Sequence, residues 1–139
     1  MLERIISSYF TNVLTIYPIV TVTGPRQSGK TTLVKNALPD WNYVSLEDPD
    51  VRSFCKNDCR GFLETYPENT IIDEAQRVPE LFSYLQTHVD SKHKNGMYVL
   101  TGSQNMNMME SISQSLAGRT SVLKLLPFSY EEKKNAGIL

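Results

Sequence analysis

Residues 19–38 contain the pattern that most restricts the fold: a β-branched run, a glycine-containing loop and a short helical stretch, in that order. The run Ile19-Val20-Thr21-Val22-Thr23 is typical of a buried strand. Residues 31–38 are typical of a helix that ends before Pro39. The loop between them reads Gly24-Pro25-Arg26-Gln27-Ser28-Gly29-Lys30-Thr31, which fits G-x-x-x-x-G-K-[ST]. Free N–H groups and the dipole at a helix N-terminus favour anions, so this order predicts a phosphate-binding loop.

Each residue type in the loop suits contact with a nucleotide and Mg²⁺. Glycines let the backbone approach the phosphates, Lys30 can reach the β- and γ-phosphates, and the Thr31 hydroxyl can bind Mg²⁺. Arg26 and Gln27 are expected to shape the loop or line the pocket rather than act on the phosphate. We expect the Lys30 side chain to be largely solvated when no nucleotide is bound. The expected nucleotide contacts are Gly24, Pro25, Arg26, Gln27, Ser28, Gly29, Lys30, Thr31 and Thr32.

The second half of the predicted site is Thr70-Ile71-Ile72-Asp73-Glu74, an apolar strand that ends in two acids. Neighbouring residues at a strand end point to opposite sides, so one carboxylate can face a metal and the other the attacking water. We assign Asp73 to Mg²⁺, through water, and Glu74 to the general base. A solvated acidic turn is the alternative for this pair taken alone.

A later strand, Met97-Tyr98-Val99-Leu100-Thr101, runs into the polar residues Ser103 and Gln104. If it lies between the phosphate-loop strand and the acidic strand, Ser103 is the better candidate to polarise the attacking water or the γ-phosphate. The alternative is that these residues cap the next helix. A glutamate directly after the metal-site aspartate favours a hydrolase over a phosphoryl-transfer kinase.

Five stretches together make the chain resemble the ATPase core of AAA-type P-loop proteins. More closely, it looks like the prokaryotic ATP-binding proteins whose ATPase domain precedes an uncharacterised C-terminal domain. The resemblance implies an α/β fold of three layers, with a five-stranded parallel sheet in the order 5-1-4-3-2 and helices on both faces. It also implies hydrolysis of ATP with Mg²⁺ and a water-polarising Ser103. The stretches are residues 24–33, 45–50, 71–76, 100–104 and 115–119.

Arg119 lies between a predicted helix over 106–116, ended by Gly118, and a strand over 121–125. This places it at the amino-terminal edge of the sheet, whereas nucleotides bind at the carboxyl edge. The resemblance implies that such an arginine completes the site of a neighbouring subunit in a homo-oligomer. An ion pair that holds the helix–strand turn is the alternative. Asp48 before Pro49 is expected to cap a helix, and Glu47 either belongs to that turn or helps to organise Mg²⁺.

The rest of the chain is consistent with one domain, residues 1–139, that opens with an amphipathic helix within 1–17. Lys plus Arg number 14 and Asp plus Glu 15, a net charge of −1, so no global basic field points to nucleic acid. Cys55 and Cys59 are predicted to be reduced, as in the cytoplasm, rather than zinc ligands. No apolar run approaches the roughly 20 residues of a membrane span, and no signal peptide is seen. Residues 126–139 do not read as the helical lid usual in AAA-type ATPases, so we expect a piece of a longer protein.

These observations predict an ATP-binding, Mg²⁺-dependent ATPase core that acts as a motor or switch for domains outside this chain. Two other functions remain open. A P-loop phosphotransferase would pass the γ-phosphate to a metabolite, and a nucleotide-gated interaction module would bind a partner with little turnover. The sequence does not identify a protein or nucleic-acid partner.

Overall fold

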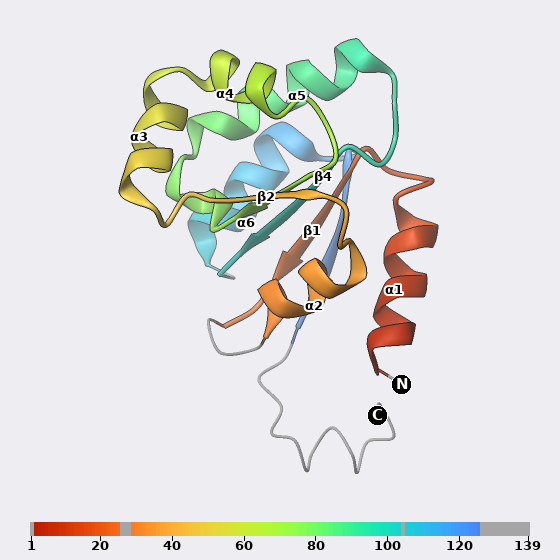
Figure 1. The fold of residues 1–139 in the computed structure, drawn as a ribbon. Helices are drawn as coiled ribbons and strands as arrows, with labels where there is room; N and C mark the ends of the chain where they lie inside the picture. The colour runs from red at the N-terminus through yellow and green to blue at the C-terminus, as the bar shows by residue number, and fades with distance from the viewer. Residues whose placement is uncertain (1, 26–28, 104, 126–139) are drawn as a thin grey trace.

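The protein is built around one five-stranded parallel sheet (Figure 1). The computed structural model describes residues 2–25, 29–103 and 105–125. The strands lie in the order β2-β3-β4-β1-β5, which is the predicted 5-1-4-3-2. They are β1 (Ile19–Thr23), β2 (Asn42–Ser45), β3 (Thr70–Asp73), β4 (Tyr98–Gly102) and β5 (Thr120–Lys124).

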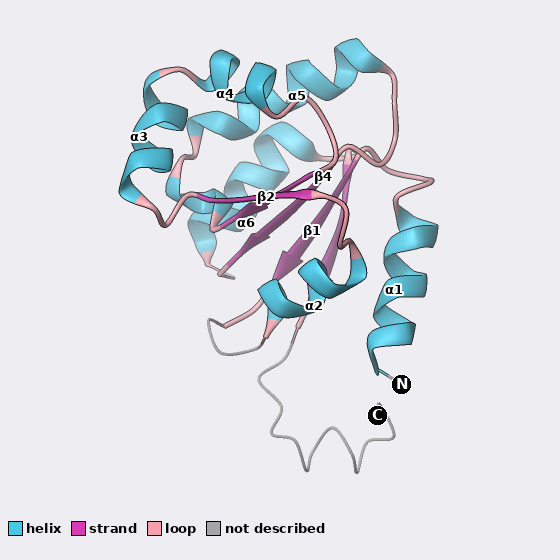
Figure 2. Cartoon of the chain, in the orientation of Figure 1, coloured by secondary structure: helices cyan, strands magenta, loops and turns pink. Residues whose placement is uncertain are grey.

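Helices cover both faces of the sheet and give the expected three layers (Figure 2). The first layer consists of α1 (Leu2–Val13) and α2 (Lys30–Ala37), and the second of α3 (Pro49–Asn57), α4 (Cys59–Thr65), α5 (Glu80–Lys92) and α6 (Met106–Ser111). Strand residues alternate between the two cores, because successive side chains point to opposite faces. In β3, for example, Ile71 packs with Phe10 and Val34 on the first face, whereas Ile72 packs on the second.

The helix boundaries follow local sequence signals. Asp48 caps α3 by accepting a hydrogen bond from the Asp50 backbone N–H, with Pro49 at the first helical position, as predicted. Asn105 caps α6 in the same way, and its helix continues as a π-helical segment, Ile112–Leu116. Gly118 then adopts φ = 79°, a left-handed conformation that suits glycine and lets the chain turn into β5.

The cysteines are two free thiols buried in the core on the α3–α6 face of the sheet. They are not on one helix, because Asp58 ends α3 and caps α4 between them. Burial raises the pKa of the Cys55 thiol well above its usual range. In the described part of the chain, no three His, Cys, Asp or Glu side chains come together as a metal site. None of the helices in that part is both long and apolar enough to cross a membrane.

Candidate nucleotide-binding site

The phosphate loop, the end of β3 and the end of β4 meet at the carboxyl edge of the sheet. The loop is tied to β4 by a 3.2 Å hydrogen bond from the Gly24 N–H to the Gly102 carbonyl oxygen. Gly29 precedes α2 with φ = 76°, a conformation that glycine adopts without strain. β4 lies between β1 and β3, as the placement of Ser103 required. This is the edge where parallel α/β sheets bind ligands.

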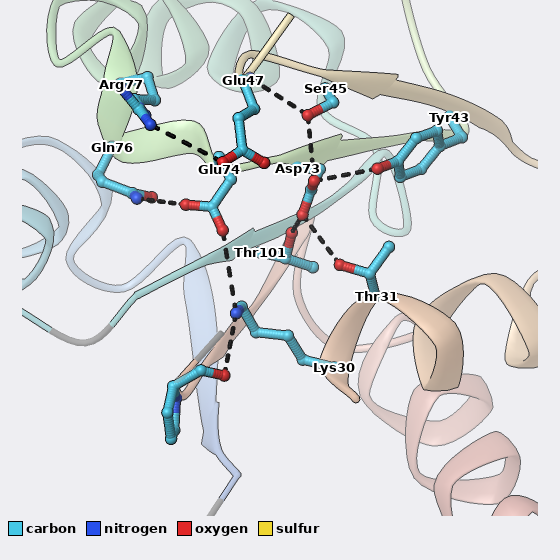
Figure 3. A network of polar contacts seen from close by, with 11 residues as sticks. Lys30, Thr31, Tyr43, Ser45, Glu47, Asp73, Glu74, Gln76, Arg77 and Thr101 are labelled. Carbon is cyan, nitrogen blue, oxygen red and sulfur yellow. Dashed lines mark hydrogen bonds and ion pairs between the residues drawn. The ribbon is translucent and has the colours of Figure 1, made fainter. Parts of the chain in front are cut away.

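Asp73 lies at the centre of a cluster of hydroxyl groups (Figure 3). Its Oδ1 accepts hydrogen bonds from Thr31 at 3.0 Å and Thr101 at 2.6 Å. Its Oδ2 accepts from Tyr43 at 3.0 Å and Ser45 at 3.1 Å. Thr31 comes from α2, Tyr43 and Ser45 from β2, and Thr101 from β4, so three elements converge on one carboxylate.

These hydroxyls keep Asp73 ionised although it is only 6% exposed. Burial alone would raise the pKa of this carboxyl, but hydrogen bonds from Thr101, Tyr43, Thr31 and Ser45 outweigh burial and hold the pKa below its ordinary value. Burial and the charge of Asp73 raise the pKa of the Tyr43 hydroxyl to about 12, so Tyr43 remains a donor at neutral pH.

The Asp73 cluster fits Mg²⁺ held through water. Mg²⁺ prefers oxygen ligands and usually keeps several of its waters. Each Asp73 oxygen already accepts two hydroxyl hydrogen bonds, which favours contact through a water over direct coordination. Thr31 donates its proton to Asp73, so the lone pairs of its oxygen stay available for the ion.

Lys30 and Glu74 lie next to each other beside the Asp73 cluster. Lys30 Nζ lies 3.9 Å from Glu74 Oε1 and donates a 3.3 Å hydrogen bond to the Pro25 carbonyl oxygen (Figure 3). The expectation of a solvated Lys30 is wrong, because the side chain is only 3% exposed. Its ammonium is held between the loop and a buried carboxylate, since a charge removed from water needs such partners.

Asp73 and Glu74 face different neighbours, as predicted, but not because side chains alternate along a strand, since β3 ends at Asp73 (Figure 3). The cause is a sharp turn in the backbone. Glu74 has φ = 55°, a left-handed conformation that is uncommon for a residue with a Cβ, and a 3₁₀ turn, Ala75–Arg77, follows it. This turn directs Glu74 toward Lys30 and Gln76, away from the Asp73 cluster.

The other predicted site residues do not join the contacts around Asp73 and Glu74 in the described part of the chain. Thr32 is exposed in the first turn of α2, and Ser103 is half-buried directly after β4. The Ser103 side chain makes no hydrogen bond to any other residue that the structure describes. Arg26, Gln27 and Ser28 lie outside the described residues. Glu47 pairs with Arg77 at 3.8 Å, and its backbone N–H donates to Ser45 Oγ.

Arg119 lies at the opposite edge of the sheet, as expected, where it pairs with Asp90 near the end of α5. Its Nε and Nη2 each donate a 2.8 Å hydrogen bond to an Asp90 carboxylate oxygen, and its Nη1 donates to the Ala117 carbonyl oxygen at 3.1 Å. These hydrogen bonds hold the turn into β5, which is the structural alternative. The role in a neighbouring subunit stays a prediction.

Sequence reasoning missed three donors to Asp73: Tyr43, Ser45 and Thr101. In the sequence, Tyr43 and Ser45 lie in an aromatic and β-branched run that is typical of a strand, and Thr101 ends the predicted strand over residues 97–101. A signal was available, because Tyr43 and Ser45 flank the buried Val44, the alternation typical of a strand with one polar face. The contact itself depends on pairing, since Ser45 lies opposite Asp73 in the β2–β3 register.

Comparison with known proteins agrees with this geometry. Residues 17–134 match the AAA domain family. The chain belongs to that family. It is 34% identical over 111 residues to the uncharacterized proteins Mb2031c of Mycobacterium bovis and Rv2008c of Mycobacterium tuberculosis, a match that covers 78% of this chain. The match covers 25% of each relative, so the chain spans about a quarter of their length.

Solved structures show the same P-loop fold. The match to the Walker-type ATPase PABY2304 of Pyrococcus abyssi covers 96% of this AAA chain and 55% of the PABY2304 chain, with a TM-score of 0.64 and 16% identity. The match to the DnaC helicase loader covers 88% of this chain and 86% of the DnaC chain, with a TM-score of 0.58 and 16% identity. The match to AMPPCP-bound DnaA from Aquifex aeolicus covers 88% of this chain and 44% of the DnaA chain, also with a TM-score of 0.58 and 16% identity.

Proposed function

We propose that this AAA domain binds ATP with Mg²⁺ and hydrolyses the ATP. We further propose that this hydrolysis makes the domain a motor or switch for other parts of a longer cytoplasmic protein. The observation that carries the proposal is the pairing across the phosphate loop and the β3 end: Thr31 with Asp73 at 3.0 Å and Lys30 with Glu74 at 3.9 Å. A metal-binding hydroxyl and a phosphate-binding ammonium are thus both next to carboxylates of the kind that ATP hydrolysis uses.

Each of the four side chains then has one task. Lys30 leaves its loop carbonyl and Glu74 to bind the β- and γ-phosphates. Thr31 and Asp73 would hold Mg²⁺, which would neutralise negative charge on the phosphates. Glu74 accepts the proton of the water that attacks the γ-phosphorus as the bond to the ADP oxygen breaks. Ser103 and the loop residues 24–32 complete the proposed nucleotide contacts.

Calorimetry and turnover of the intact natural protein test binding and chemistry separately. Lys30→Met keeps the aliphatic stem in its buried position and removes the charge, so ATP binding should be lost. Lys56→Met, on the exposed surface of α3, is the matched control and should bind as wild type. Equal ATP affinity of the Lys30 and Lys56 variants would refute the phosphate-loop assignment.

Glu74→Gln should bind ATP but turn over about 10²–10⁴-fold more slowly, the usual cost of a lost general base. Asp73→Asn should instead weaken the Mg²⁺-dependent part of binding. If Glu74→Gln hydrolyses ATP at the wild-type rate, the general base is assigned wrongly. Transfer of labelled γ-phosphate to a metabolite would then favour a phosphotransferase, and nucleotide-dependent partner capture without turnover would favour an interaction switch.

A further inference from the structure

Gln76 lies next to Glu74 and has no part in the proposed chemistry. Its Nε2 donates a hydrogen bond to Glu74 Oε2 at 2.6 Å, whereas Glu74 Oε1 lies 3.9 Å from Lys30 Nζ (Figure 3). The second distance is too long for a hydrogen bond. Among the residues that the structure describes, the Gln76 amide is therefore the group that holds the Glu74 carboxylate by a hydrogen bond, whereas Lys30 acts on that carboxylate through charge alone.

The orientation of this amide is set by Glu74. The opposite end, Gln76 Oε1, is buried and has no donor among the residues that the structure describes. The reverse orientation would place the amide oxygen 2.6 Å from a carboxylate oxygen, so two acceptors would face each other. Within the described part of the chain, Gln76 thus keeps a buried oxygen without a hydrogen-bond donor, which costs stability, while its own N–H donor remains on Glu74.

Gly102, the last residue of β4, provides the room for this amide. A Cβ at Gly102 would lie 2.3 Å from Gln76 Oε1 and 3.2 Å from Met108 Cε. Gly102 does not have a positive φ, so a larger residue here would act through space, by displacing the Gln76 amide, and not through backbone conformation. The Gln76 amide is consequently held between the β4 end and the Glu74 carboxylate.

We propose that Gln76 is a positioning residue that fixes the Glu74 carboxylate for catalysis. Gly102, which lacks a Cβ, leaves the space that the Gln76 amide occupies. This inference rests on the proposed role of Glu74 as general base. With Oε2 held by the amide, Oε1 stays free to accept the proton of the attacking water. Lys30 can also move to the phosphates without carrying the carboxylate with it, because no hydrogen bond joins the two.

The test is a double-mutant cycle in the intact natural protein, with ATP affinity, kcat and thermal unfolding measured together. Gln76→Met keeps the length of the side chain and removes the donor, so kcat should fall at least 10-fold with ATP affinity unchanged. In a Glu74→Gln background, Gln76→Met should lower kcat no further. The matched control is Gln114→Met, which removes a 3.0 Å Gln–Glu hydrogen bond to Glu110 on the surface and should leave kcat unchanged.

Gly102→Ala supplies a second measurement. It should lower kcat and Tm in the wild type, because the new Cβ displaces the amide, but should lower Tm much less in a Gln76→Ala background, where the clash is gone. A wild-type kcat for Gln76→Met beside a slow Glu74→Gln would overturn the positioning role alone, and so would equal effects of Gln76→Met in both backgrounds. A wild-type rate for Glu74→Gln would overturn the proposed function itself.

Discussion

Thr101→Val tests whether the hydroxyl cluster keeps Asp73 charged in the folded protein. Thr101 donates the shortest of the four hydrogen bonds, 2.6 Å to Asp73 Oδ1, and both residues are buried. Valine keeps the shape of threonine and removes the donor. A hydrogen bond to a charged group contributes about 1.5–3 kcal/mol, so the free energy of unfolding at neutral pH should fall by that amount.

The loss should depend on pH in a direction fixed by the Asp73 pKa. That pKa is lowered in the folded state, so its contribution to stability is present above the unfolded value, near 3.9, and is lost as pH falls through the folded value. Thr101→Val moves the folded pKa back toward the unfolded one. The stability difference between wild type and variant should therefore be full at neutral pH and shrink below about pH 4.

Urea unfolding at several pH values measures this difference. Thr21→Val is the matched control, because Thr21 is also a buried strand threonine, but its hydroxyl bonds to the neutral hydroxyl of Thr120 at 2.8 Å. Thr21→Val should lower the free energy of unfolding by about 0.5–1.5 kcal/mol, and this decrease should not depend on pH. A pH-independent loss for Thr101→Val as well would refute the reasoning, since the hydrogen bond would then not act through the charge of Asp73.

Two further predictions concern residues around the site. In an ultraviolet titration, the difference between wild type and Tyr43→Phe should show the Tyr43 phenolate forming near pH 12 rather than pH 10, because burial and Asp73 raise its pKa. The stability due to this hydroxyl should be present below pH 10 and lost as pH rises through 12, and ionisation near pH 10 would contradict the hydrogen bond. If Arg119 completes a neighbouring subunit's site, Arg119→Ala should lower turnover but spare ATP affinity, and mixing it with Glu74→Gln subunits should restore activity. Asp90→Ala breaks the same ion pair but keeps the arginine, so equal turnover of the two variants would leave Arg119 a structural residue.

The residues themselves predicted the elements that carry the site. A β-branched run, a glycine loop and a helix are local patterns, and the backbone needs of a phosphate loop restrict which residues can occupy it. The adjacent acids Asp73 and Glu74 could also be predicted to follow an apolar strand, and a helix could be predicted to start at Asp48. The strand order came from the family resemblance, because local periodicity does not say which strands are neighbours.

The surroundings of the two acids were decided only by the tertiary structure. Tyr43, Ser45 and Thr101 are ordinary strand residues in the sequence, and they gather on Asp73 because β2, β3 and β4 pair side by side in one register. Lys30 was predicted to be solvated, but the turn at Glu74 places a buried carboxylate beside it. Sequence patterns report which residues share a face of one element, whereas the charge state and burial of a side chain depend on what neighbouring elements bring to it.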